Sequence, residues 1–255
     1  MIPIVTSFNP DRRAALHQIG CFETWASQGF DVVAVQGQGE IIPDRIASRR
    51  CRGVEVTRID ESGPPRLIHL LRKAATIEGA ILLNSDLMML PGFFEAIQSW
   101  MGQTWGETGC LWLRRWNIGQ DVPVELASKM KATREQWGID AFAVRPSSAL
   151  LEFFDNLDLR IGRPGWDYVL PYWFKLRGLP LWTIDDPPLL LHRDHPIRWS
   201  QASWEQNTLI GAKALGLAPT VQLSHLSRQL NHDVDKYSKR LALPCWYVGQ
   251  VDSTA

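Results

Sequence analysis

The chain has 255 residues and a formal net charge of zero, because 27 Lys and Arg residues balance 27 Asp and Glu residues. This length suits one large domain or two small ones, with a core that needs neither disulfides nor a structural metal. The zero charge argues against a broad basic surface for duplex nucleic acid, and four scattered cysteines without a C-x-x-C pair argue against a zinc ribbon.

The apolar run in the N-terminal segment MIPIVTSFNP is too short for a signal peptide, because polar residues follow it closely. No apolar run elsewhere approaches the length of a membrane span. We therefore expect a soluble, cytoplasmic protein without a transmembrane segment, in which the cysteines are reduced thiols. Some of the twelve tryptophans will belong to the core. The others suit a groove that stacks on flat ligands such as sugar rings or bases.

The first half of the chain alternates apolar strands with amphipathic helices. Short runs rich in β-branched residues predict strands at 2–8, 30–37, 53–60 and 80–83. Apolar residues at helical spacing predict helices at 11–28, 66–75 and 91–101, the last opened by a Pro-Gly pair.

The second half continues the alternation less regularly. It predicts strands at 110–116 and 138–146, a proline-broken extended segment at 180–196, and a polar tail at 249–255. It also predicts helices at 148–157, 166–178, 203–216 and 220–243. Strands that alternate with helices favour a mostly parallel central sheet with helices on both faces, so we expect an α/β fold in a single domain.

Three polar residues, Asn84, Ser85 and Asp86, interrupt the apolar run that ends the fourth predicted strand. Ligands of open α/β sheets gather at the carboxyl ends of strands, and a divalent cation stabilises a carboxylate placed there. One interpretation is a metal–diphosphate site in which Asp86 binds Mg²⁺ or Mn²⁺. The other is a loop in which Asn84 or Asp86 caps the following helix or bonds its own turn. The buried strand before the triplet favours the metal site.

The segment AILLNSDLMMLPGFF resembles the D-x-D segment of GT-A fold glycosyltransferases, with a family 2-like order of elements over about the first 175 residues. Asn84 stands where that family has its first acid. The resemblance implies one GT-A-like domain across residues 1–255. Within it we expect a nucleotide-binding half at about 1–110, an acceptor and catalytic half at about 111–215, and a C-terminal helical tail at about 216–255.

The resemblance also implies an activity. The chain would be a metal-dependent glycosyltransferase that moves a sugar from a nucleotide-diphosphate sugar to an acceptor hydroxyl, with inversion at the anomeric carbon. Its cofactor would be Mn²⁺ or Mg²⁺, and its partners a nucleotide sugar and a carbohydrate or other hydroxyl acceptor, without nucleic acid.

Two further aspartates are candidates for the base that such a transfer requires. Asp167 begins the helix expected at 166–178 and matches the position of the acidic base in inverting members; the alternative is that it caps this helix. Asp140 lies in a strand of small and apolar residues. It could be the base instead, hold the acceptor, or pair with Arg134 or Arg145.

The remaining candidates contact the cation or the donor. In the glycosyltransferases that the chain resembles, a downstream histidine completes the set of metal ligands, and His192 or His195 matches its position. The alternative for each histidine is a hydrogen-bonded residue in a loop. The candidate metal ligands are therefore Asp86, His192 and His195. The candidate donor contacts, some of which could instead be turn formers or solvated surface charges, are Thr6, Ser7, Arg66, Lys73, Asn84, Ser85 and Asp86.

Two other functions remain open. A nucleotidyltransferase-like enzyme is the first, although the segment TSFNPDRR lacks the glycine-rich phosphate loop typical of that class. A non-catalytic sugar- or nucleotide-binding module is the second, and Asn84 in place of an acid favours it. The donor sugar, the nucleobase, the linkage and the oligomeric state are not specified by these patterns.

Overall fold

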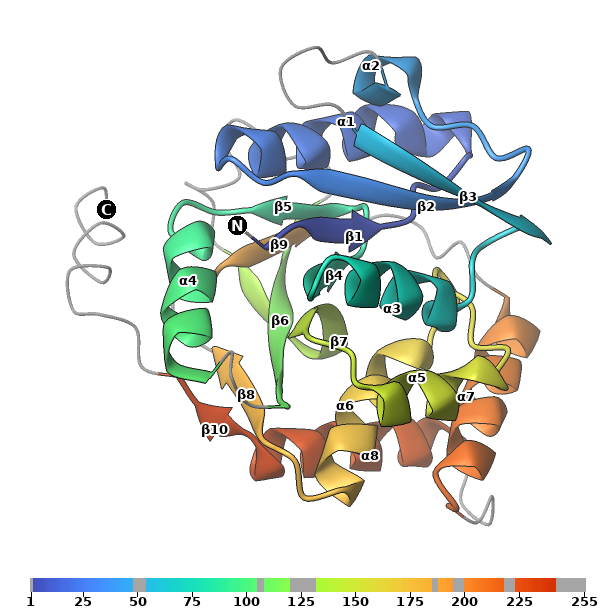
Figure 1. Cartoon of the computed structure of the whole chain (residues 1–255), viewed down its shortest axis with the longest axis vertical. Helices are drawn as coiled ribbons and strands as arrows, with labels where there is room; N and C mark the ends of the chain where they lie inside the picture. The colour runs from blue at the N-terminus through green and yellow to red at the C-terminus, as the bar shows by residue number, and fades with distance from the viewer. Residues whose placement is uncertain are drawn as a thin grey trace.

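A computed structural model of the chain describes residues 2–47, 54–104, 108–119, 132–184, 188–194, 200–217 and 223–241 (Figure 1). The strands are β1 (Ile4–Thr6), β2 (Val32–Gln38), β3 (Val54–Ser62), β4 (Ala80–Leu83), β5 (Leu87–Met89), β6 (Cys110–Ile118), β7 (Thr133–Val144), β8 (Leu181–Ile184), β9 (Leu190–Arg193) and β10 (Lys239–Arg240). The helices are α1 (Arg12–Ser27), α2 (Asp44–Ala47), α3 (Leu67–Thr76), α4 (Phe93–Thr104), α5 (Ser148–Asp155), α6 (Trp166–Leu176), α7 (Gln201–Ala214) and α8 (Leu223–Tyr237).

The strands form one mostly parallel sheet in the order β10-β8-β6-β7-β4-β1-β2-β3. Strands β3, β2, β1 and β4 run parallel, whereas β7 is antiparallel to both of its neighbours, β4 and β6. The short strands β5 and β9 pair with each other, and β9 also pairs with β6. The predicted α/β class and the mostly parallel sheet are confirmed.

Alternate residues of the central strands face two separate cores, which is why these strands are apolar throughout. On β4, Ile81 and Leu83 face the core covered by α1 and α4, while Ala80 and Leu82 face the core covered by α3, α5, α6 and α8. Each fully buried aliphatic or aromatic side chain stabilises the fold by about 1.5–3 kcal/mol. Helices therefore cover both faces of the sheet, as the sequence predicts (Figure 1).

Side chains of α1 hold the edge of β5 that does not face β9. Because β5 has a partner strand on one edge only, its other backbone groups need side-chain partners. Helix α1 and its C-cap residue Gln28 supply them. The bonds run from His17 Nε2 to the Asp86 carbonyl (3.1 Å), from Trp25 Nε1 to the Leu87 carbonyl (2.7 Å), from the Met89 amide to Thr24 Oγ1 (2.9 Å) and from Gln28 Nε2 to the Leu90 carbonyl (3.0 Å). We call these four side chains the α1 ladder.

Several predicted boundaries differ from the structure. The predicted strand at 138–146 begins earlier, at Thr133, because its N-terminal part pairs with the end of β6. The predicted helix at 220–243 ends at Tyr237, because Lys239 and Arg240 pair with β8. Strand β5 and the one-turn helix α2 were not predicted. The polar tail at 249–255 lies outside the described residues.

No helix in the described part of the chain combines the length and the apolar character required to cross a bilayer.

Candidate active site

A cleft of about 820 Å³ opens at the carboxyl ends of β1 and β4. Its walls come from residues 7–10 after β1, 84–86 after β4, 161–168 around the start of α6, and residues of β6, β7 and β9. Segments far apart in sequence thus meet at one edge of the sheet, where ligands of open α/β sheets bind. Of the predicted site residues, the cleft gathers Ser7, Asn84, Ser85, Asp86, Asp140, Asp167 and His192.

Asp86 and His192 lie side by side in this cleft. Strand β5 pairs with β9 so that Leu87 is opposite His192, and this register brings the preceding Asp86 to the imidazole. The Asp86 Oδ2 to His192 Nε2 distance is 3.5 Å, with the histidine side chain 7% exposed and the aspartate side chain 32% exposed. The aspartate can therefore reach a ligand while the histidine stays fixed in the wall.

This pair fits two ligands of a hard or borderline divalent cation. Carboxylate oxygen and imidazole nitrogen are both accepted by Mn²⁺, and Mg²⁺ commonly takes one or two carboxylates together with phosphate oxygens and water. Among the described residues no three His, Cys, Asp or Glu side chains form a ligand set, so substrate oxygens and water would fill the other positions. His195, the third predicted ligand, lies outside the described residues.

His17, which the sequence analysis did not select, fixes the loop that carries Asp86. Its Nε2 is 3.1 Å from the Asp86 carbonyl, and since a carbonyl only accepts, this nitrogen donates. Burial lowers the pKa of His17 and keeps the ring neutral, although the charge of Asp86 acts in the opposite direction. Only its position on the inner face of the first helix, which gives a weak signal, could have identified it.

The side-chain amide of Asn84 has a partner in the neighbouring strand that a carboxylate at this position could not serve. Its side-chain amide donates to Asp140 Oδ1 at 2.7 Å, and its backbone N–H donates to the Asp140 carbonyl at 3.1 Å. A carboxylate at position 84 could not donate and would face a second negative charge. The amide therefore suits this position because Asp140 occupies the neighbouring strand.

The other Asp140 oxygen binds Arg115, which corrects the predicted pairing with Arg134 or Arg145. Arg115 Nη1 lies 2.9 Å from Asp140 Oδ2. The β6–β7 register shifts on both sides of Arg114, and this irregularity turns the next residue toward the cleft.

Arg115 is a cation that lies among the carboxylates of the cleft. Burial opposes its charge, but the carboxylates of Asp140, Asp86, Glu135 and Asp167 outweigh burial and raise its pKa. It therefore stays protonated and offsets part of the acidic charge. The charged pair Arg114-Arg115 inside the otherwise apolar strand at 110–116 was the signal that could have revealed it.

Asp167 is buried in the first turn of α6, with 8% of its surface exposed. Burial raises its pKa to about 7 and the charge of Asp140 adds to this, while the Gly165 N–H, 2.9 Å from Oδ1, and the charge of Arg115 lower it. The predicted N-cap role is wrong, because the N-cap residue is Gly165. Gly165 has a φ of 111°, which a side chain would strain.

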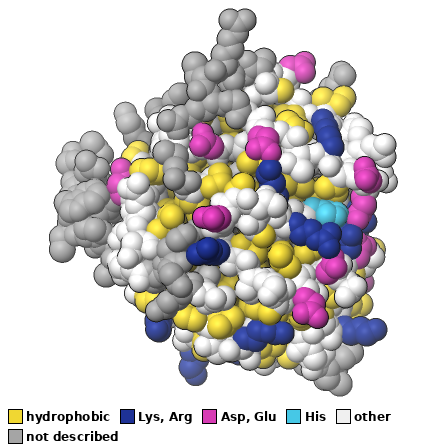
Figure 2. All heavy atoms as spheres, in the orientation of Figure 1, with side chains coloured by type: hydrophobic (Ala, Val, Ile, Leu, Met, Phe, Trp, Pro, Cys, Tyr) yellow, Lys and Arg dark blue, Asp and Glu magenta, His cyan; other side chains and the backbone are white. Residues whose placement is uncertain are grey.

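The predicted phosphate-binding cations lie elsewhere, on α3 and at its N-cap. Arg66 Nη2 is 2.7 Å from Glu61 and Lys73 Nζ is 2.5 Å from Glu55, so both contact acids of β3 rather than the cleft. Helix α3 turns its apolar face to the sheet, which leaves its charged residues on the outside. Figure 2 shows basic side chains, a histidine and acidic side chains close together on the right of this face of the molecule. This corrects the expected placement of Arg66 and Lys73.

Thr6 supports the site from below instead of lining it. Its hydroxyl donates to the Leu83 carbonyl at 2.6 Å and its side chain is fully buried. The bond joins β1 to β4 directly beneath the Asn84–Asp86 loop.

Comparisons with known proteins match the fold. No protein-family profile and no curated protein matches the chain. The crystal structure of TarS residues 1–349 from S. aureus is 14% identical, with a TM-score of 0.54 over 93% of this chain and 71% of that chain. Glucosyl-3-phosphoglycerate synthase from Mycobacterium tuberculosis, crystallised with Mn²⁺, uridine diphosphate and phosphoglyceric acid, is 14% identical, with a TM-score of 0.50 over 86% of this chain and 80% of that chain. The chain has the GT-A fold of these glycosyltransferases, as predicted.

Proposed function

We propose that the protein is a metal-dependent glycosyltransferase that uses a nucleotide-diphosphate sugar. The observation that carries this proposal is the arrangement of the cleft. The Asp86–His192 pair stands at the carboxyl end of β4, and Asp167, a buried acid with a pKa raised to about 7, belongs to the same cleft. The Asp86–His192 pair suits a cation and its diphosphate, and Asp167 suits proton transfer.

Asp86 and His192 would hold the cation, which would neutralise the charge that develops on the departing diphosphate. We favour Mn²⁺, because the pair includes an imidazole and because the similar synthase was crystallised with Mn²⁺ and uridine diphosphate. Arg115 adds a fixed positive charge to the same cleft.

Asp167 acts as the base in this proposal. It takes the proton of the acceptor hydroxyl as that oxygen bonds the anomeric carbon and the bond from this carbon to the diphosphate breaks. One direct displacement of this kind inverts the anomeric centre. A carboxyl group with a pKa near 7 is a stronger base than an ordinary one and is still partly ionised at neutral pH.

Asp140 supports this chemistry without taking the proton. Its two oxygens are engaged by Asn84 and Arg115, at 2.7 and 2.9 Å, so proton uptake would disrupt two charge-assisted contacts. Its negative charge raises the pKa of Asp167. We therefore assign Asp140 a positioning role.

Thermal-shift measurements on the full chain with a panel of nucleotide sugars, with Mn²⁺ or with EDTA, test the proposal. Stabilisation should require donor and metal together, because each contributes ligands to the other. Asp86→Asn should abolish this joint stabilisation, and Asp31→Asn, at an exposed position at the start of β2, should preserve it.

Release of nucleoside diphosphate in the presence of acceptors then separates the alternatives. A glycosyltransferase releases the diphosphate, whereas a nucleotidyltransferase releases pyrophosphate from a nucleoside triphosphate. Donor stabilisation that persists in EDTA and in Asp86→Asn, without any turnover, would contradict the proposal and favour a binding module.

A further inference from the structure

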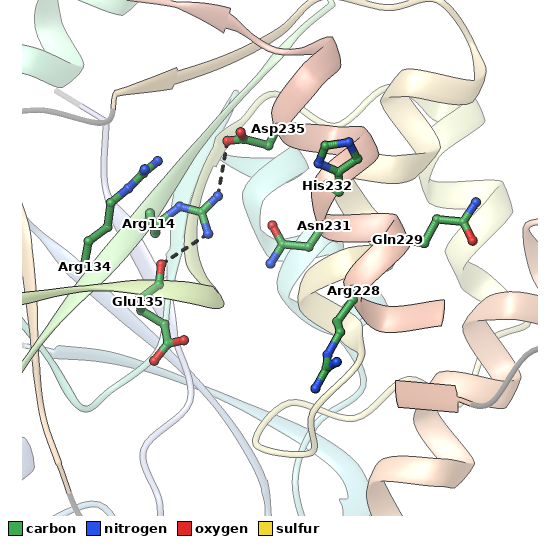
Figure 3. A pocket seen from close by; sticks show the side chains of 8 residues that line it. All are labelled: Arg114, Arg134, Glu135, Arg228, Gln229, Asn231, His232 and Asp235. Carbon is green, nitrogen blue, oxygen red and sulfur yellow. Dashed lines mark hydrogen bonds and ion pairs between the residues drawn. The ribbon is translucent and has the colours of Figure 1, made fainter. Parts of the chain in front are cut away.

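A second hollow, of about 620 Å³, lies between the β6–β7 pair and α8 (Figure 3). Its described lining contains three arginines, a histidine, a glutamine and an asparagine, but only two carboxylates. Arg114 and Arg134 come from the strands, while Arg228 and His232 come from α8 (Figure 3). We call this site the arginine hollow. The transfer proposed for the neighbouring cleft makes no use of it.

The two carboxylates leave an excess of positive charge in the arginine hollow. Asp235 Oδ1 lies 3.2 Å from a guanidinium nitrogen of Arg114 and 3.2 Å from one of Arg240. Glu135 accepts a bond from the Asn117 amide at 2.7 Å. In Figure 3 its carboxylate points away from Arg114, which instead contacts the Glu135 carbonyl at 3.3 Å.

Arg114 is already fixed at the base of the hollow. Its side chain is 5% exposed, and its guanidinium lies 5.0 Å from the centre of the Trp112 ring. An anion that binds beside it gains charge-assisted hydrogen bonds without the cost of ordering this side chain. Arg134 and Arg228 stand at exposed positions at the rim. A hollow lined by one buried arginine and two exposed ones suits an anionic group that enters from solvent.

The arginine hollow adjoins the catalytic cleft. Glu135 lines both, and Arg115, next to Arg114 in β6, lies 3.9 Å from the Glu135 carboxylate on the cleft side. The β6–β7 pair is therefore the wall between the two sites.

We propose that the arginine hollow binds an anionic group, phosphate or carboxylate, of the acceptor whose hydroxyl reacts in the cleft. This inference rests on the proposed function and specifies its acceptor class. Planar guanidinium groups recognise both oxyanions through paired hydrogen bonds.

Binding of inorganic phosphate and of acetate, each in EDTA and at constant ionic strength, tests the site without donor or metal. Phosphate, acetate or both should raise the melting temperature of the unaltered chain and of Arg45→Gln, whose side chain is 71% exposed beside Glu23. The double variant Arg134→Gln/Arg228→Gln should lose this shift while its melting temperature without the anion stays the same, because both positions are exposed. An equal shift in the double variant, or no shift with either anion in the unaltered chain, overturns the proposal.

Transfer assays decide the acceptor class. Nucleoside diphosphate release should be faster with sugar phosphates or sugar acids than with the matching neutral sugars. In Arg134→Gln/Arg228→Gln the KM of the anionic acceptor should rise about tenfold or more, with the donor KM and kcat retained, and the matching double Lys variant should recover part of the loss. Equal KM changes for neutral and anionic acceptors refute the inference. Loss of metal-dependent donor binding would instead refute the proposed function, and the phosphate and acetate measurements decide the anion site independently.

Discussion

The carboxyl group of Asp167 is held between its two protonation states at neutral pH. Burial and the charge of Asp140 disfavour its ionised form, while the Gly165 N–H and Arg115 favour it, and the result is a pKa of about 7. Activity that depends on the carboxylate should therefore increase as pH rises through about 7.

Asp167→Asn tests this role and its pH dependence. We expect transfer to fall by about 10²–10⁴-fold, because the amide cannot take a proton, while Asp31→Asn keeps its activity. The pKa of about 7 in the folded chain exceeds the ordinary aspartate value of 3.8, so the contribution of Asp167 to stability is full below 3.8 and is lost as pH rises toward 7. Denaturant titrations at several pH values should show the variant gaining stability relative to the unaltered chain over this range. A variant with full activity, or with an unchanged pH dependence of stability, would contradict the assignment.

Asn84→Asp tests why the Asn84–Asp86 loop has an amide at its first position. The new carboxylate loses the 2.7 Å bond to Asp140 and opposes its charge, which should cost about 1–3 kcal/mol at pH 8 and less at pH 4. Asn156→Asp, at the exposed C-cap of α5, is the control. Thermal unfolding measures the stability, and titration with Mn²⁺ measures the metal affinity. Tighter metal binding with unchanged stability would refute this explanation of Asn84.

At the level of whole elements, side chains of helix α1 stabilise strand β5 by hydrogen bonding to its backbone. Strand β5 has three residues and one partner strand, and the α1 ladder supplies the bonds that its other edge needs. Because Asp86 immediately precedes β5, the ladder also sets where the carboxylate lies. The precision of the proposed metal site thus depends on a helix on the other side of the loop.

Trp25→Phe should loosen this arrangement. It removes the donor to the Leu87 carbonyl, which costs about 1–3 kcal/mol, and it should raise the Mn²⁺ concentration needed for donor stabilisation. Trp173→Phe is the matched control, since Trp173 is equally buried but its Nε1 has no hydrogen-bond partner among the described residues. It should lower stability without altering the Mn²⁺ requirement. Equal effects of the two variants on metal dependence would show that the ladder does not position Asp86.

Elements with a clear apolar pattern could be predicted from the sequence, and elements without one could not. The helix at 66–75 and the strand at 80–83 match α3 and β4 closely, because their apolar pattern is decided locally. Strand β5 escaped prediction since three buried residues carry no period. Arg115 escaped because its orientation depends on an irregular strand pairing. Asp86, Asp167 and His192 could be selected because each interrupts or follows an apolar segment.

At the scale of the whole molecule, the cleft joins two halves of one sheet. One side comes from the loops after β1 and β4, and the other side comes from the segment at 161–168 and from β9. The two sides are tied together by the β4–β7 and β5–β9 pairs. Ligands in the cleft should therefore stabilise segments from both sides at once.

Hydrogen exchange can measure this coupling. Donor and Mn²⁺ together should slow exchange at residues 84–90 and 161–168, while α4, which does not line the cleft, should change little. Either ligand alone should protect these segments less than the two together. Protection limited to the segment at 84–90 would indicate that the donor does not reach Asp167.

The bond between Asn84 and Asp140 has a consequence for how similar enzymes are recognised. The loop itself keeps one acid, and the second acid of the neighbourhood arrives from a strand 56 positions further along. A search for a sequence motif with two acids in one loop will overlook proteins with this arrangement. A search for carboxylates that lie close together in the folded structure will find them, even where the sequence motif is absent.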